Sequence, residues 1–175
     1  MTAGGGAMFA SRRWLLAALA ALTIAGRACA NGDDAEPWLR ALHEQKRVTN
    51  GDVMLAAALI SDDKTWRNDP EWAQQVCKRR DLLRTKPPGG LKAHARRGYA
   101  ASVFARLLDI EGGLWSRIFD QPSRYAYREL VTLGMIAPGG DSVPLDGDEL
   151  NGLLLAAERY RKVGPERLPQ RGVVP

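Results

Sequence analysis

Two stretches decide the fold: residues 87–108, PPGGLKAHARRGYAASVFARLL, and residues 137–158, APGGDSVPLDGDELNGLLLAAE. Each begins with a Pro-Gly-Gly loop and continues into apolar residues at helical spacing, and Pro88 and Pro138 lie 50 residues apart. The short helix expected before each loop aligns as well, with Leu83 matching Leu133. Self-similarity at this period predicts helical repeat units that bury their apolar faces against one another. The alternative is two unrelated helical hairpins that share Pro-Gly turns.

The recurrence of apolar residues every three or four positions predicts helices through most of residues 36–162. Asp69-Pro70 is typical of a helix start, with Asp as the cap and Pro in the first turn. Thr49-x-x-Asp52 and Asp146-x-x-Glu149 have the spacing of a capping box. Gly134 is placed to end a helix. The expected helices cover residues 36–46, 49–60, 70–84, 99–108, 123–133 and 147–162, an all-α fold.

The beginning of the chain has the three parts of a secretory signal peptide. Arg12 and Arg13 precede an apolar or small run from Trp14 to Ile24, and Ala28-Cys29-Ala30 offers a small-x-small cleavage site. The run is too short for a membrane span, which needs about 20 apolar residues. We therefore expect residues 1–30 to be cleaved, leaving an exported protein of the periplasm, cell envelope or extracellular space without a transmembrane span. An uncleaved anchor and a lipid anchor on Cys29 are the alternatives.

Removal of this peptide changes the charge argument. The chain has 25 Lys and Arg, 20 Asp and Glu and a formal charge of +5, but residues 1–30 contain three arginines and no acid. The remainder is close to neutral at +2, which argues against a nucleic-acid partner. Cys77 is then the only cysteine, so no internal disulfide is expected, and its helical neighbours predict burial. The length suits one domain with a core of its own.

No catalytic or metal-binding constellation is recognisable. His43 and His94 are the only histidines, and neither has the two or three further ligands that a metal site requires. Cys77 has no neighbouring histidine to act as a base. We therefore expect no enzyme activity, no metal and no cofactor; a small envelope enzyme remains the least favoured alternative.

The pattern around the two loops resembles S-layer homology repeats, in which an aromatic-Asp start, a short helix, a Gly turn and a loop precede a longer helix. The fuller copy is Ile118-Phe119-Asp120, Tyr125-Ala126-Tyr127-Arg128-Glu129-Leu130, Leu133-Gly134-Met135-Ile136, Leu145-Asp146-Gly147-Asp148-Glu149-Leu150 and Leu154-Leu155. The weaker copy is Trp66, Asp69, Trp72-Ala73, Leu82-Leu83, Gly90-Leu91, Arg97-Gly98-Tyr99-Ala100 and Leu107-Leu108. Thr49-Asn50-Gly51-Asp52 would open the long helix of an incomplete first unit.

The resemblance implies a three-unit helical bundle over residues 48–162, after an N-terminal linker or short helix at 31–47 and before a flexible tail at 163–175. In this family a Thr-Arg-Ala-Glu motif opens each long helix, and its Arg and Glu help bind anionic, pyruvylated cell-wall glycan. The equivalent pairs here are Asn50 and Asp52, Arg97 and Tyr99, and Gly147 and Glu149. Only one unit keeps the Arg and none keeps the whole motif, so the Asp and Glu residues also fit simple helix caps.

One basic cluster, Lys92-His94-Arg96-Arg97, stands out, with further Lys and Arg residues from Lys78 to Lys86 just before it. It fits a solvated surface or a site for an anionic partner. An envelope glycan or an envelope protein is the expected partner, and a purely structural or protein-interaction domain is the alternative. The candidate ligand-binding residues are Lys92, Arg96, Arg97, Asp52 and Glu149.

Overall fold

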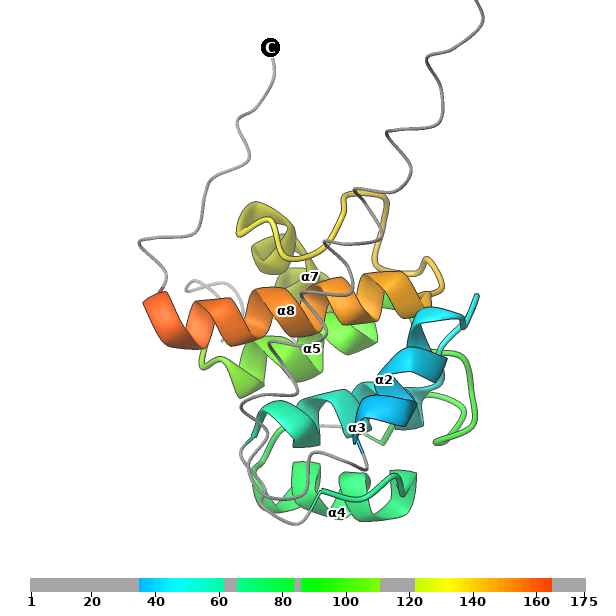
Figure 1. Ribbon diagram of the computed structural model, residues 1–175. Helices are drawn as coiled ribbons and strands as arrows, with labels where there is room; N and C mark the ends of the chain where they lie inside the picture. Colours follow the sequence, from blue (N-terminus) through cyan, green and yellow to red (C-terminus); the bar gives the residue numbers. More distant parts are fainter. Residues whose placement is uncertain (1–34, 62–65, 84–85, 111–121, 165–175) are drawn as a thin grey trace, which may run out of the picture.

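A computed structural model describes residues 35–61, 66–83, 86–110 and 122–164. The regular structure of these residues is six α-helices: α2 (Ala35–His43), α3 (Asn50–Ile60), α4 (Pro70–Arg79), α5 (Arg97–Leu107), α7 (Pro122–Thr132) and α8 (Gly147–Val163) (Figure 1). The all-α prediction is therefore confirmed over the described part of the chain. The expected signal peptide with Cys29, the tail from residue 165 and the Ile118-Phe119-Asp120 start lie outside the described residues. No described helix is both long and apolar enough to cross a membrane.

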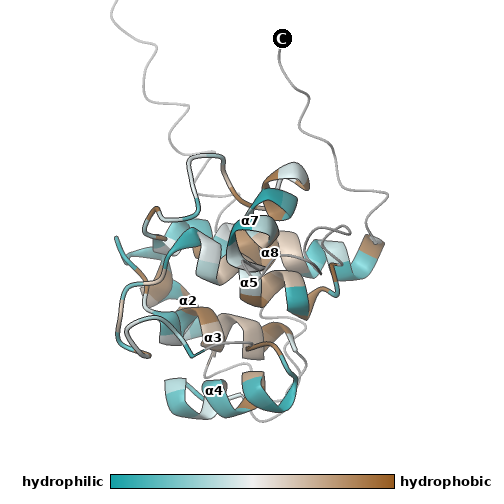
Figure 2. Cartoon of the chain, turned by 180° about the vertical axis from the view of Figure 1, so that it is seen from behind, coloured by the Kyte–Doolittle hydropathy of each residue, from teal (hydrophilic) through white to brown (hydrophobic). Residues whose placement is uncertain are grey.

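Helix α3 lies at the centre of the molecule. Every residue from Val53 to Ala58 is buried, and α3 packs against α4, α5 and α8. A helix that is apolar around its whole circumference is stable only when other elements cover it on all sides. Seen from behind, α3 is accordingly apolar, whereas α4 next to it presents mostly hydrophilic residues (Figure 2).

We call α2, α4 and α7 the short helices and α3, α5 and α8 the long helices, after their place in the expected units, although α3, α5 and α7 each have 11 residues. Each short helix packs on one long helix. Helix α4 packs on α3, α7 on α5, and α2 on α8, so the last of these pairs joins the first and the last described helices (Figure 1). The inner face of α2 is buried through Trp38, Leu39 and Leu42. The ring of Trp38 also lies 5.7 Å from that of Trp66, measured between centroids, at a tilt of 50°. Helix α2 therefore belongs to the same core as the helices that follow it.

Helix α4 is shorter than the sequence predicts. It ends at Arg79 instead of residue 84, because Asp81 adopts a left-handed backbone with φ 54° and the Leu82 amide donates to the Cys77 carbonyl at 2.9 Å. Helix α7 ends in the same way: Gly134 has φ 70° and the Met135 amide donates to the Leu130 carbonyl at 2.8 Å. This bond, spanning six residues, is that of a Schellman motif, and it confirms the predicted end at Gly134.

A closed ring of backbone hydrogen bonds joins the starts of the three long helices. The Ala95 amide donates to the Val48 carbonyl at 2.9 Å, Leu145 to Ala95 at 3.0 Å, and Val48 to Leu145 at 3.1 Å. All three side chains are buried. Each of the three residues directly precedes the N-cap of a long helix, Thr49 for α3, Arg96 for α5 and Asp146 for α8. The ring therefore places three helix N-termini at one end of the molecule.

Candidate functional site: the shared end of the long helices

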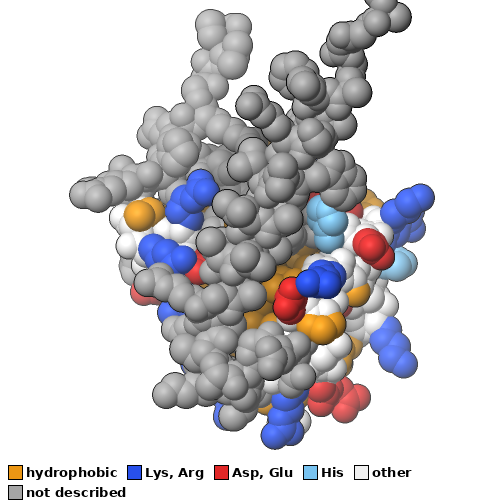
Figure 3. All heavy atoms as spheres, in the orientation of Figure 1, with side chains coloured by type: hydrophobic (Ala, Val, Ile, Leu, Met, Phe, Trp, Pro, Cys, Tyr) orange, Lys and Arg blue, Asp and Glu red, His pale blue; other side chains and the backbone are white. Residues whose placement is uncertain are grey.

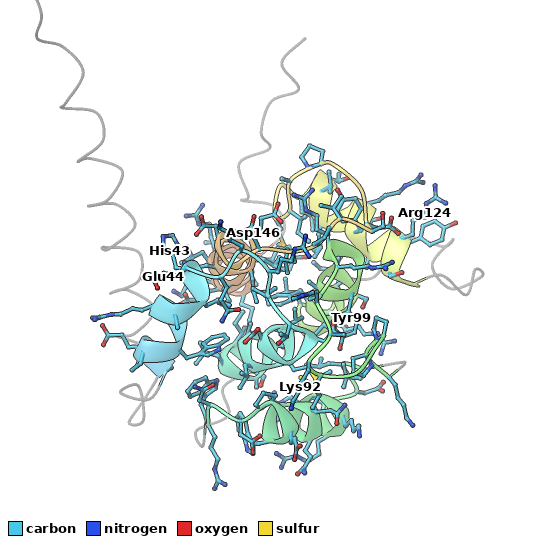
Figure 4. The ribbon with its side chains drawn as sticks, turned by 90° about the vertical axis from the view of Figure 1, so that its right-hand side faces the viewer. His43, Glu44, Lys92, Tyr99, Arg124 and Asp146 are labelled. Carbon is cyan, nitrogen blue, oxygen red and sulfur yellow. The ribbon has the colours of Figure 1, made fainter. Side chains whose placement is uncertain are left out.

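The ring determines what surrounds the candidate residues. Figure 4 looks at this end of the molecule: α8 is viewed nearly along its axis with Asp146 at its start, His43 and Glu44 lie beside it, and Lys92 lies between α3 and α4. Lys, Arg, His and acidic side chains crowd the corresponding right-hand side of the surface in Figure 3. The first turns of three helices add positive partial charge here, since their amides point toward this end.

The three N-caps differ in how well they satisfy those amides. At α3 the Thr49 side chain accepts from the Asp52 amide and the Asp52 carboxylate accepts from the Thr49 amide at 2.8 Å, so the predicted capping box is confirmed. At α8 the Asp146 carboxylate accepts from the Glu149 amide at 2.8 Å, but Glu149 points elsewhere, so only half of the predicted box forms. At α5 the N-cap Arg96 makes no side-chain cap, and the first two amides donate instead to the backbone carbonyls of Val143 at 3.0 Å and Asp141 at 2.8 Å.

Glu149 instead pairs with Arg97, the first residue of α5. The Arg97 Nε donates to Glu149 Oε2 at 3.1 Å and its Nη2 donates to Oε1, a two-pronged contact across 52 residues of sequence. The side chains are only 14% and 21% exposed, so water screens the pair less than it would a surface pair. The pKa of the Arg97 guanidinium is raised above its ordinary value, mainly by the side-chain hydrogen bond to Glu149.

The first helical residue of each long helix meets a neighbouring loop or helix end. The buried Asn50 side chain donates from Nδ2 to the carbonyls of Pro88 and Gly90, both at 2.9 Å. The Arg97 guanidinium lies so close to Gly139 that a Cβ there would be 2.6 Å from Nη1. Both contacts involve the Pro-Gly-Gly loops from which the repeat was inferred.

At α8 the corresponding residue is Gly147, and the last turn of α2 abuts it. The Gly147 amide donates to the Gln45 carbonyl at 2.8 Å. A Cβ on Gly147 would lie 1.7 Å from the Leu42 carbonyl oxygen. The His43 Nδ1 and the Asp148 carboxylate, 2.5 Å apart, complete this joint at the surface.

The candidate residues divide into two sets. Arg97, Glu149 and Asp52 are half-buried and engaged with protein groups. Lys92 and Arg96 are exposed, as is His94 between them. The candidate residues lie at one end of the molecule, but the sequence alone did not separate those engaged with protein groups from those that face solvent. Sequence reasoning missed the His43–Asp148 contact and the Asn50 contacts, which depend on tertiary neighbours and have no local sequence signal.

Two titratable groups behind this end are buried, the Cys77 thiol and the Tyr99 phenol. Burial raises the pKa of the Cys77 thiol to about 12, so the thiol stays protonated, and its Sγ lies 3.7 Å from the Met54 carbonyl. The predicted burial of Cys77 is confirmed. Burial likewise raises the pKa of the Tyr99 phenol. A protonated, enclosed thiol is a poor nucleophile. Among the described residues, no cluster of three or more His, Cys, Asp or Glu side chains could hold a metal.

The missing cap at Arg96 gives a testable consequence. We expect Arg96→Ser to raise the free energy of unfolding by about 1 kcal/mol, because a serine hydroxyl can accept from the Tyr99 amide in the first turn of α5. Thr49→Ala removes an existing cap and should lower it by about 1 kcal/mol. Urea unfolding followed by circular dichroism measures both. No gain from Arg96→Ser, with a normal loss from Thr49→Ala, would contradict the uncapped start of α5.

Comparison with known proteins adds no relative: no protein-family model, curated protein or solved structure matches this chain.

Proposed function

We propose that the chain is an exported, non-catalytic module of three S-layer-homology-like units: α2 with α3, α4 with α5, and α7 with α8. The observation that carries this proposal is the ring of Val48, Ala95 and Leu145, in which the same backbone position of each unit bonds to the next. The packing of every short helix on a long helix of another unit supports it as well. Interlocking of this kind is expected of units that cannot bury their apolar faces alone.

The ring also supports the correspondence of the motif positions. Thr49, Arg96 and Asp146 are all N-caps, so Asn50, Arg97 and Gly147 occupy the first helical position and Asp52, Tyr99 and Glu149 the third. These are the positions that the Arg and Glu of the family motif would take. The expected partner at this end is an anionic polymer of the cell envelope or an envelope protein.

Co-sedimentation of the purified protein with isolated cell-wall sacculi tests the polymer version. We expect the protein to be retained in the pellet at low salt and released as the salt concentration rises. Salt screens the attraction between exposed charges, with a Debye length of about 10 Å at 0.1 M. Absence of retention at every salt concentration would contradict polymer binding.

A second candidate, a structural or protein-interaction domain without glycan binding, is favoured by one observation. The motif side chains that would grip a ligand are already engaged, Arg97 with Glu149 and Asp52 with Thr49. An Arg97→Ala variant that loses stability but sediments with sacculi as the parent does would show that this motif position serves the fold.

A further inference from the structure

The end of the molecule where the long helices start carries exposed basic side chains that form no ion pair within the described residues. Lys92, His94 and Arg96 are all exposed, and we call them the basic row. Arg96 makes no cap, and none of the three forms an ion pair with another described residue. Their neighbour Arg97, by contrast, is engaged with Glu149.

The backbone places His94 and Arg96 on one side of an extended segment, and Lys92 lies in the turn just before it. His94 pairs with Thr49 and Arg96 with Pro144 in isolated antiparallel bridges, so residues 94–96 are extended, with Ala95 buried between two exposed side chains. The carbonyls of Leu91 and Ala93 both accept from the start of α3, at 2.9 Å. Successive side chains on one side of an extended segment lie about 6.5 Å apart. Arg47, exposed and next to Val48 in the ring, adds a further cation close by.

We propose that the basic row is the surface that binds a linear polyanion, a polymer whose anionic groups recur along its chain; this rests on the proposed envelope-binding function. A row of cations fits a chain of charges better than it fits a single compact anion. The only large apolar side chain exposed among the described residues is Val163, at the far end of α8, so the row has no apolar surface for inserting into a membrane.

The acids near the row do not cancel it. Asp52 and Asp146 are turned toward the amides of their own helices, Glu149 toward Arg97, and Asp148 toward His43. Glu44 is exposed, as are Asp69 and Glu71 at the start of α4, and Asp141 is half-buried. Four of the acids are thus held by helix starts and ion pairs, whereas Lys92 and Arg96 of the row and Arg47 are exposed.

Binding of fluorescein-labelled polyphosphate, followed by fluorescence anisotropy at low salt, tests the proposal on the full chain. The double variant Lys92→Gln/Arg96→Ser should bind at least about fivefold more weakly, since each exposed charge contributes roughly two- to fivefold. The matched control Lys78→Gln/Arg80→Gln removes two exposed charges from the other end of α4 and should change affinity less than about twofold. Arg96→Ser should raise the thermal midpoint by about 3 °C, so weaker binding would not reflect unfolding.

Three outcomes would overturn the proposal: parental affinity in the row variant, an equal loss in the control, or stronger binding to phosphatidylglycerol vesicles than to polyphosphate. The same proteins are sedimented with sacculi. Retention that does not depend on the row would overturn this proposal but leave the envelope-binding function standing. Row-dependent polyphosphate binding without retention on sacculi would support the row and contradict the wall-polymer version of the function.

Discussion

Gly147→Ala is expected to lower the free energy of unfolding by about 3 kcal/mol, the largest effect of any single methyl group we predict here. The added Cβ would lie 1.7 Å from the Leu42 carbonyl oxygen and 2.8 Å from its carbon, both backbone atoms at the end of α2. Backbone cannot rotate aside as a side chain can, so α2 must shift away from α8. Urea unfolding measures the loss, and hydrogen exchange should show weaker protection in residues 35–43 than elsewhere.

Gly152→Ala is the matched control. It lies in the same helix, is exposed, and would place its Cβ with no heavy atom of another residue within 4 Å. Alanine is the better helix former, so this change should raise the free energy of unfolding by about 0.5–1 kcal/mol. Two substitutions of identical chemistry in one helix are thus expected to have opposite signs. A neutral Gly147→Ala would mean that α2 does not abut the start of α8.

This joint bears on the proposed function, because it closes the arrangement of units. Helices α3 and α4 are consecutive among the described helices, as are α5 and α7. Helices α2 and α8 are at opposite ends of the described chain and contact each other only in the folded structure. The ring bond from Val48 to Leu145 and the Gln45–Gly147 contact both depend on that closure. If α2 were detached, the starts of the long helices would lose one of their three connections.

The sequence predicted the elements better than their ends. Apolar spacing found all six described helices, and Asp69-Pro70 and Thr49-Asp52 marked two starts correctly. The end of α4 was not predicted because an Asp, not a Gly, takes the left-handed position. Asp tolerates that backbone but is also common elsewhere, so it gives no clear sequence signal for a helix end. Asp81 and Gly134 therefore occupy the same position at the ends of their helices, whereas the sequence alone had aligned Leu83 with Leu133.

The candidate site shows a different limit of prediction from sequence, namely the contacts between units. The spacing of Asp146 and Glu149 correctly predicted a capped helix start, but a local pattern could not reveal that Glu149 faces Arg97 from another unit. Pairing across 52 residues depends on how the ring brings α5 and α8 together. The basic cluster was visible in the sequence, yet its division into exposed Lys92 and Arg96 and engaged Arg97 required the fold.

Arg97→Ala is expected to lower the free energy of unfolding by about 2 kcal/mol. Removing one partner of an enclosed ion pair leaves the other charge without compensation, which costs about 3–5 kcal/mol when the pair is fully buried. The Glu149 side chain keeps 21% of its exposure, so water recovers part of that cost. The change also removes the guanidinium packed against Gly139 in the second Pro-Gly-Gly loop. Urea unfolding of the parent and the variant measures the difference.

A double-mutant cycle that combines Arg97→Ala with Glu149→Ala separates the energy of the ion pair from that of the Arg97 packing against Gly139. We expect a coupling of about 1–2 kcal/mol between Arg97 and Glu149 that largely persists in high salt, because the side chains are mostly enclosed. The pair of Arg40 with Glu36 on α2, 2.6 Å apart but 78% and 43% exposed, is the control. Its coupling should be at most about 0.5 kcal/mol and should vanish in high salt. Equal couplings in the two cycles would mean that the Arg97–Glu149 pair is as exposed to water as the pair on α2. Both side chains could then turn to an external ligand, and the motif positions would again be candidates for a binding site.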